Sequence, residues 1–206
     1  MDKFKTEQEK FWAEEFGNEY INRNNGSQLL ASNLNFFTKA LANAGKIKSC
    51  KEFGANIGMN SKALKLLYPD INLQAIEINE EACIELSKII GTENVFNGSI
   101  FDSSSESKFE LALIKGVLIH INPDMLQLVY QKLYESSNKF ILIAEYYNPT
   151  PVSIPYRGNV DKLFKRDFAG EFLIKYPDTE LIDYGFAYKN DPAFPQDDIT
   201  WFLIKK

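Results

Sequence analysis

The sequence contains one histidine and two cysteines among 206 residues. Cys50 and Cys83 do not have metal-ligand spacing, and a single histidine cannot complete a histidine cluster, so neither a metal site nor a disulfide framework is expected. No window approaches the roughly eighteen consecutive apolar residues of a membrane span, and no apolar run follows the N-terminal residues 1–5. We therefore predict a reduced, cytoplasmic protein without a metal or a membrane partner.

Positive charge is also scarce, with 23 Lys and Arg against 28 Asp and Glu and a net charge of −5. A broad electrostatic footprint for nucleic acid is not expected from this balance. Apolar residues make up 45% of the chain, which is enough for one full core at this length. We predict a single domain over residues 1–206, composed of an N-terminal helical cap (1–45) and a core (46–206).

Short apolar segments alternate with segments of helical spacing through the middle of the chain. This alternation predicts parallel strands joined by right-handed helical crossovers. Two C-terminal segments on either side of a proline-containing loop predict an antiparallel final pair. The expected fold is α/β, a doubly wound Rossmann-like sheet of seven strands, mostly parallel with an antiparallel final strand, and with helices on both faces. The predicted strands are 49–53, 73–77, 95–96, 109–114, 140–144, 180–188 and 199–204.

Helices are predicted over residues 7–23, where an aromatic stripe is broken at Gly17, and from Ser27, as the N-cap, to about Ala44. Residues 150–158 contain two prolines and no core pattern, which predicts a loop serving as a lid or substrate wall. Residues 161–176 are predicted to be helical. Residues 148–178 would then form a loop and helix on the acceptor side of a site.

The most informative segment is Glu52 to Asn60, which lies between a predicted strand and a predicted helix. Gly54 and Gly58 allow backbone amides to approach a ligand closely. A dinucleotide fingerprint would require glycines at 54, 56 and 59, so a nicotinamide cofactor is disfavoured. About twenty residues further on, the next strand ends in Glu77, whose carboxylate can accept both hydroxyls of a ribose.

This loop together with Glu77 resembles the first two motifs of class I S-adenosylmethionine-dependent methyltransferases. The resemblance implies that the loop lies under the methionine part of the cofactor and that Glu77 holds the ribose. An acid that binds adenine often follows the third strand in this class. Ser99 stands there instead, which predicts adenine recognition by backbone amides and a hydroxyl. The implied cofactor-binding residues are Glu52, Gly54, Asn56, Gly58, Asn60, Glu77, Ile78, Ser99, Ile100, Lys115, Gly116 and Val117.

Longer segments resemble the small methyltransferase family associated with pseudaminic acid biosynthesis, and the resemblance covers nearly the whole chain. It implies transfer of a methyl group from S-adenosylmethionine to a sugar or nucleotide-sugar intermediate of surface glycans, with S-adenosylhomocysteine as product. Two alternatives remain, a nucleotide-sugar oxidoreductase and a catalytically silent cofactor-binding or partner-binding domain. The segments that carry the resemblance are 11–24, 54–58, 116–123, 145–149, 156–158 and 163–170.

Candidate catalytic residues follow the fourth and fifth predicted strands. His120 is the one side chain whose unperturbed pKa suits a general base near neutral pH, although a structural or cofactor-side role is an alternative. Tyr146 could hydrogen-bond the nucleophile and Tyr147 could form a wall of the acceptor site, with aromatic packing as the alternative.

Charged residues suggest two further contacts. Tyr20 and Arg23, one helical turn apart, could clamp the methionine carboxylate beneath an N-terminal lid, or the helix could be a packing face. Arg157, Lys165 and Arg166 could recognise an anionic acceptor, such as a sugar acid or a nucleotide sugar, or form a solvated helix face. The predicted substrate-binding residues are Tyr147, Asn148, Tyr156, Arg157, Lys165 and Arg166.

Overall fold

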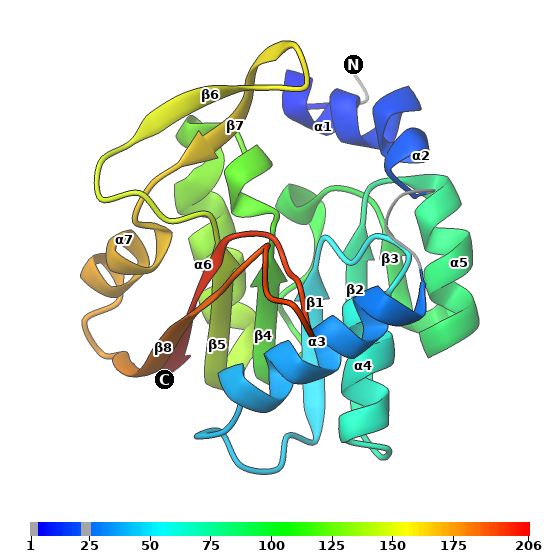
Figure 1. Cartoon of the computed structure of the whole chain (residues 1–206), viewed down its shortest axis with the longest axis vertical. Coiled ribbons are helices and arrows are strands. Elements are labelled where there is room, and N and C mark those ends of the chain that lie inside the picture. Colours follow the sequence, from blue (N-terminus) through cyan, green and yellow to red (C-terminus); the bar gives the residue numbers. More distant parts are fainter. Residues whose placement is uncertain (1–3, 22–25) are drawn as a thin grey trace.

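The computed structural model describes residues 4–21 and 26–206, apart from the side chains of Glu15, Tyr20 and Val160. A seven-stranded sheet in the order β3-β2-β1-β4-β5-β9-β8 forms the centre of the molecule, with helices on both faces (Figure 1). This arrangement confirms the predicted fold class. The strands of the sheet are β1 (Ser49–Phe53), β2 (Asn72–Glu77), β3 (Val95–Asn97), β4 (Phe109–Lys115), β5 (Ser137–Glu145), β8 (Glu180–Ala187) and β9 (Ile199–Lys205).

The helices connect these strands and cover the sheet. The α-helices are α1 (Glu7–Ala13), α2 (Glu15–Ile21), α3 (Ser27–Ala40), α4 (Met59–Leu67), α5 (Glu80–Ile90), α6 (Leu126–Ser136) and α7 (Phe168–Lys175). Short 3₁₀ turns are η1 (Thr92–Asn94), η2 (Ile100–Asp102), η3 (Leu118–His120) and η4 (Pro123–Met125). Within the part of the chain that is described, no helix is both long and apolar enough to span a bilayer.

The strand β1 lies between β2 and β4 and is parallel to both. Cys50 of β1 is opposite Leu73 on one side and Leu111 on the other. Strand β9 runs in the opposite direction and pairs antiparallel with β5, placing Ala144 opposite Trp201. The carboxyl ends of the five parallel strands therefore meet at one edge of the sheet, where ligands bind in folds of this kind.

Alternate residues of the central strands pack in two cores because successive side chains of a strand point to opposite faces. On β4, Leu111 and Leu113 are buried in the core that also contains residues of α3, α4 and α5. Ala112 and Ile114 are buried in the other core, against α6 and α7. All four are fully buried. This two-sided burial explains why β4 reads as a continuous apolar run in the sequence.

The N-terminal helices differ from the prediction at their ends. The first helix ends at Ala13 and the second starts at Glu15, so the break precedes Gly17. Gly17 is required for packing, because a Cβ there would lie 2.0 Å from the carbonyl oxygen of Trp12. The α3 helix begins at Ser27 with Gly26 as its N-cap, and it ends at Ala40 rather than near residue 44.

The region predicted to be a loop (150–158) and a helix (from 161) is instead a β-hairpin. Strand β6 (Val152–Tyr156) pairs antiparallel with β7 (Asn159–Lys165), and the helix α7 starts only at Phe168. Arg157 and Gly158 join the strands with φ of 50° and 84°, as a tight hairpin turn requires. A proline is tolerated in β6 because that two-stranded sheet has only edge strands. The predicted loop conformation was therefore wrong, and the role as a lid or substrate wall stays a prediction.

Candidate functional site

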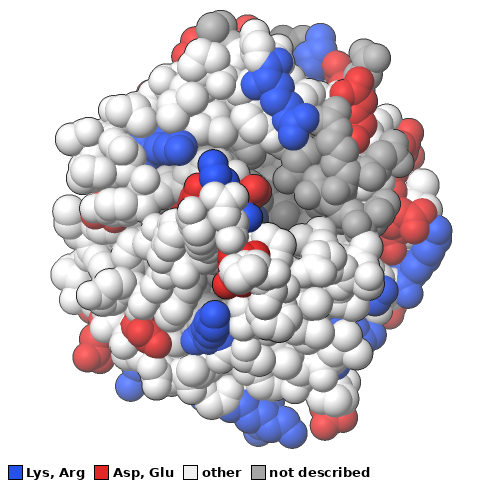
Figure 2. Space-filling view, in the orientation of Figure 1, with Lys and Arg blue, Asp and Glu red and all other residues white. Residues whose placement is uncertain are grey.

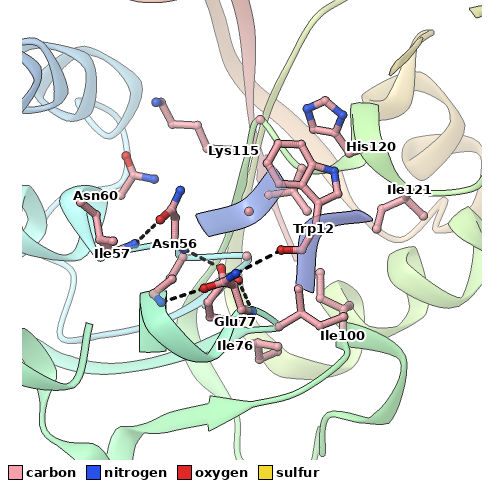
Figure 3. A pocket seen from close by; sticks show the side chains of 18 of the residues that line it. Trp12, Asn56, Ile57, Asn60, Ile76, Glu77, Ile100, Lys115, His120 and Ile121 are labelled. Carbon is pink, nitrogen blue, oxygen red and sulfur yellow. Dashed lines mark hydrogen bonds between the residues drawn. The ribbon is translucent and has the colours of Figure 1, made fainter. Parts of the chain in front are cut away.

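A cavity of about 450 Å³ lies at the carboxyl edge of the parallel strands. The glycine loop after β1, the ends of β2 and β4 and the turn after β3 form it, with α1 and the loop before β9 against it (Figure 3). Its volume is in the range of small-molecule pockets. Eleven predicted site residues line this cavity: Gly54, Asn56, Asn60, Glu77, Ile78, Ser99, Ile100, Lys115, Gly116, Val117 and His120.

The glycine loop and the acid of β2 are joined by a hydrogen bond. The backbone N–H of Asn56 donates to Glu77 Oε2 at 2.7 Å, and the N–H of Asn79 donates to Oε1 at 2.8 Å. Burial raises the pKa of Glu77, while these amide hydrogen bonds lower it. Each carboxylate oxygen has a second lone pair, so Glu77 is still able to accept two hydroxyl groups from the cavity.

Two glycines with positive φ shape the loops around the cavity. Gly54 has a φ of 74°, and a Cβ there would lie 2.6 Å from Val117 Cγ2. Gly116 has a φ of 68°, and a Cβ there would meet no atom within 4 Å. Since Gly116 lines the cavity, a side chain at this position would occupy ligand space.

Glu52 and Gly58 do not line the cavity, which corrects their predicted direct contact with a cofactor. Glu52 is 2% exposed; its oxygens accept hydrogen bonds from Asn60 Nδ2 at 2.9 Å and Ser61 Oγ at 2.6 Å. Burial raises its pKa to about 7. Glu52 thus positions Asn60, which does line the cavity. Gly58 is the N-cap of α4, and a Cβ there would lie 2.7 Å from Leu86.

Lys115 at the end of β4 brings a cation into the cavity (Figure 3). Burial lowers its pKa, while Asp197, Glu52 and Glu145 raise it. Its Nζ lies 5.2 Å from the centre of the Phe36 ring, a cation–π distance. Asp197 belongs to the loop before β9, which lines the cavity with residues that sequence reasoning did not identify. No local motif marks that loop, because its position depends on the pairing of β8 with β9.

His120 is 8% exposed and packs against two aromatic rings that also contact each other. Its ring centre lies 4.5 Å from that of Trp12 and 5.0 Å from that of Tyr156. Its Nδ1 lies 2.7 Å from the carbonyl oxygen of Lys162, so Nδ1 carries the hydrogen and Nε2 the lone pair. Burial lowers its pKa to about 4, so the imidazole is neutral at pH 7.

The first N-terminal helix lies against the cavity through residues that were not predicted. Glu9 and Trp12 of α1 line it. Arg23 lies outside the described residues, and only the backbone of Tyr20 is described, in α2. The sequence does contain a signal for Glu9, since Thr6 and Glu9 have the spacing of a capping box. That signal indicates a helix start and gives no information about a cavity.

The predicted acceptor residues do not line the cavity. Arg166 pairs with Glu171 at 3.3 Å. Lys165 lies in β7, with its Nζ 5.1 Å from the centre of the Tyr146 ring, so the predicted solvated helix face was wrong. Asn148 Nδ2 donates to the carbonyl oxygen of Thr150 at 2.5 Å, and Tyr147 is 44% exposed.

The hairpin turn contains the remaining two acceptor predictions. Arg157 is exposed, with its guanidinium 5.7 Å from the centre of the Tyr156 ring. Tyr156 in turn packs on His120. In the space-filling view, basic side chains are spread over the visible face, and acidic and basic groups meet around a hollow near its middle (Figure 2).

Several solved structures with a similar fold are methyltransferases. Magnesium protoporphyrin IX methyltransferase of Synechocystis PCC 6803, with S-adenosylmethionine bound, is 9% identical over 100% of both chains, with a TM-score of 0.71. A Burkholderia thailandensis 1,6-didemethyltoxoflavin N1-methyltransferase, with its substrate and S-adenosylhomocysteine, is 13% identical over 97% of this chain and 86% of that one (TM-score 0.70). Mitomycin 7-O-methyltransferase is 13% identical over 98% of this chain but 61% of that one (TM-score 0.67).

These likenesses establish a class I methyltransferase fold. Neither a protein-family model nor a curated protein matches the sequence. The resemblance to the pseudaminic acid-associated family therefore has no support from these comparisons. Among the described residues, no group of three or more His, Cys, Asp or Glu side chains is placed to hold a metal ion.

Proposed function

We propose that this protein is an S-adenosylmethionine-dependent methyltransferase that acts on a small molecule. The observation that carries the proposal is the hydrogen bond between Asn56 and Glu77, which joins the glycine loop and the acid of β2 on one cavity wall. Proteins of the same fold contain S-adenosylmethionine or its product in crystals. The domain organisation we propose is a helical cap over residues 1–45 on a core of residues 46–206.

The residues present fit the cofactor. The open space at Gly116 and the loop backbone at Gly54 leave room for the methionine part, and Lys115 offers a cation for its carboxylate. The carboxylate of Glu77 would hold the ribose hydroxyls. When bound, the cofactor supplies an activated methyl group on a sulfonium. The protein's own contribution is then to align an acceptor, exclude water and receive a proton.

His120 and its aromatic neighbours form the acceptor side in this proposal. The neutral imidazole can accept a hydrogen bond through Nε2 without first losing a proton. Trp12 and Tyr156, which pack against it and lie 6.4 Å from one another between ring centres, would exclude water from the acceptor. Tyr146 packs beside Lys165, outside the cavity lining, and is the weaker catalytic candidate.

The acceptor class we propose is an anionic small molecule such as a sugar acid or a nucleotide sugar. Its support is the motif resemblance together with Arg157 at the tip of the hairpin, next to Tyr156. Replacing Arg157 with Ala should raise the KM for the acceptor far more than the Kd for the cofactor. Equal effects on both constants would contradict this role.

Calorimetric titration of the full chain with S-adenosylmethionine, S-adenosylhomocysteine and NAD tests the cofactor. Binding of the first two and not of NAD is expected, while binding of NAD alone would indicate the oxidoreductase. Mass spectrometry across a panel of sugar and nucleotide-sugar precursors then tests turnover through a gain of about 14 daltons, the mass of a methylene. Cofactor binding without turnover of any acceptor would favour a catalytically silent domain.

A further inference from the structure

Glu9 is a buried carboxylate on the wall of the cavity, only 8% exposed. It lies in the first turn of α1, where Thr6 and Glu9 form a reciprocal capping box. Glu9 Oε2 accepts the backbone N–H of Lys5 at 2.6 Å and that of Thr6 at 3.1 Å. Both lone pairs of Oε2 are therefore occupied, and the helix start fixes the orientation of the carboxylate.

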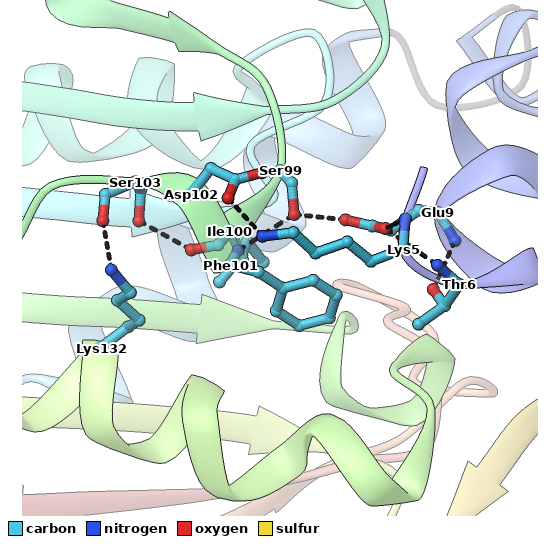
Figure 4. A network of polar contacts seen from close by, with 9 residues as sticks. All are labelled: Lys5, Thr6, Glu9, Ser99, Ile100, Phe101, Asp102, Ser103 and Lys132. Atoms are coloured by element: carbon cyan, nitrogen blue, oxygen red, sulfur yellow. Dashed lines mark hydrogen bonds and ion pairs between the residues drawn. The ribbon is translucent and has the colours of Figure 1, made fainter. Parts of the chain in front are cut away.

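The other oxygen, Oε1, contacts Ser99 in the turn after β3 (Figure 4). Ser99 Oγ accepts the N–H of Phe101 at 3.0 Å, so its hydroxyl hydrogen is directed to Glu9. The same turn is tethered a second time, since Lys5 pairs with Asp102. Oε1 keeps one lone pair after accepting from Ser99, and it is the atom of Glu9 with capacity for another donor.

The position of this lone pair matches a nucleobase rather than a sugar. Strand β3 is the neighbour of β2, so Ser99 lies one strand beyond Glu77 at the same sheet edge. Ile78, which follows Glu77, and Ile100, which follows Ser99, also line the cavity, and their apolar side chains suit the faces of a flat ring. An adenine attached to a ribose at Glu77 would reach this place and present its exocyclic amine.

We propose that Glu9 recognises the cofactor's adenine by accepting a hydrogen bond from its 6-amino group. The inference rests on the proposed function. The acid thus comes from the N-terminal helix rather than from the turn after β3, and Ser99 acts as a positioning residue that holds it. A carboxylate only accepts hydrogen bonds, so it favours an amine over a carbonyl at the 6-position. The N-terminal helix is then part of the cofactor site.

The test compares S-adenosylhomocysteine with S-inosylhomocysteine, in which a carbonyl replaces the 6-amine. Calorimetry on the unmodified protein should show about tenfold or greater preference for the adenine ligand, the effect of one charged hydrogen bond. Glu9→Gln keeps the oxygen for the capping amides and turns an NH₂ donor to the cavity. This variant should bind the adenine ligand at least about tenfold more weakly and bind the inosine ligand at least as tightly as before.

Glu7→Gln is the matched control, because it removes the same charge from the same turn, where Glu7 pairs with Lys162 at the surface. Glu7→Gln should leave the preference for S-adenosylhomocysteine over S-inosylhomocysteine unchanged. Equal binding of both ligands by the unmodified protein, or an unchanged preference in Glu9→Gln, would overturn the assignment. Binding of neither ligand by the unmodified protein would overturn the proposed function itself, and the two failures are distinguishable. If Glu9→Gln fails to fold, equal binding of both ligands by the unmodified protein would still overturn the assignment.

Discussion

The side-chain amide of Asn79 donates a hydrogen bond to Asn18 Oδ1 at 2.6 Å, which fastens the N-terminal helices to the sheet edge. The same amide lies 3.4 Å from the carbonyl oxygen of Ala13. Asn79 also caps α5, since its Oδ1 accepts the N–H of Ala82 at 2.9 Å. Its backbone N–H binds Glu77. One residue therefore connects Glu77, the helix after it and the N-terminal helices.

Replacing Asn79 with Ser should loosen the helical cap while α5 keeps a side-chain cap. Amides of residues 12–18 should exchange faster, and S-adenosylhomocysteine should bind up to about tenfold more weakly, the worth of one hydrogen bond. Hydrogen exchange followed by mass spectrometry measures the first effect and calorimetry the second. Asn18→Ala removes the same hydrogen bond through its other partner. If the effects of the two substitutions on ligand affinity simply add in the double variant, Asn79 and Asn18 are not directly coupled.

Cofactor binding should protect the helical cap itself. Because Glu9 and Trp12 line the cavity, amides of residues 7–18 should exchange more slowly with saturating S-adenosylhomocysteine than without it. Amides of α7, on the outer side of the second core, are the internal reference. Amide exchange in residues 7–18 that is identical with and without the ligand would indicate that α1 and α2 only pack against the core.

Glu77→Ala should weaken S-adenosylmethionine binding by about ten- to a hundredfold, or about 1.5–3 kcal/mol, because a charged acceptor of the ribose is lost. It should also lower Tm, since the N–H groups of Asn56 and Asn79 lose their partner. Glu77→Gln separates the two effects by retaining one acceptor oxygen. A 2′-deoxyribose analogue of the ligand should be discriminated against by the unmodified protein and much less by Glu77→Gln. Unaltered ligand affinity in Glu77→Ala would refute the ribose assignment.

His120 offers a direct titration because it is the single histidine of the chain. Nitrogen-15 NMR should find the Nδ1–H tautomer at pH 7 and a midpoint near the pKa of about 4 set by burial. The unfolded chain protonates near 6.5, so this residue's contribution to stability is complete above pH 6.5 and is lost as the pH falls towards 4. A midpoint near 6.5 in the folded protein would show that the ring is solvated and charged at mildly acidic pH.

Glu145 should have the opposite pH dependence. Its Oε1 accepts the N–H groups of Val117 and Leu118, both at 2.9 Å, and burial raises its pKa to about 7. The folded state therefore holds its proton more tightly than the unfolded state, and this contribution to stability is lost as the pH rises from 4.5 through 7. A tenfold difference in proton affinity between the two states corresponds to about 1.4 kcal/mol of stability.

Glu145→Gln removes that titration and retains an acceptor oxygen. The Tm of the variant relative to the unmodified protein should therefore rise between pH 5 and pH 8, measured by thermal unfolding across the range. The exposed Glu93→Gln is the control for loss of one charge. A Tm difference that stays constant with pH would show that Glu145 is ionised throughout.

The sequence by itself determined the parallel sheet and the part of the cavity wall formed by the loops at the carboxyl ends of its strands. The apolar runs of β4 and β5 are buried on both faces, so their hydrophobic pattern indicates central parallel strands. Glu77 could be placed because a residue at the end of a parallel strand reaches the sheet edge whatever the rest of the chain does. The glycine loop follows the same logic, since the positive φ of Gly54 is a local requirement.

Only the tertiary structure decided which distant residues complete the cavity. Glu9 follows a capping box that any helix could carry, and its meeting with Ser99, 90 residues later, depends on how α1 packs. The loop before β9 reaches Lys115 through an antiparallel pairing whose register is not local. In the hairpin, the prolines led to the prediction of a loop. The segment is nevertheless a strand, because an edge strand tolerates a missing N–H. These contacts arise from packing between elements, about which local propensity gives no information.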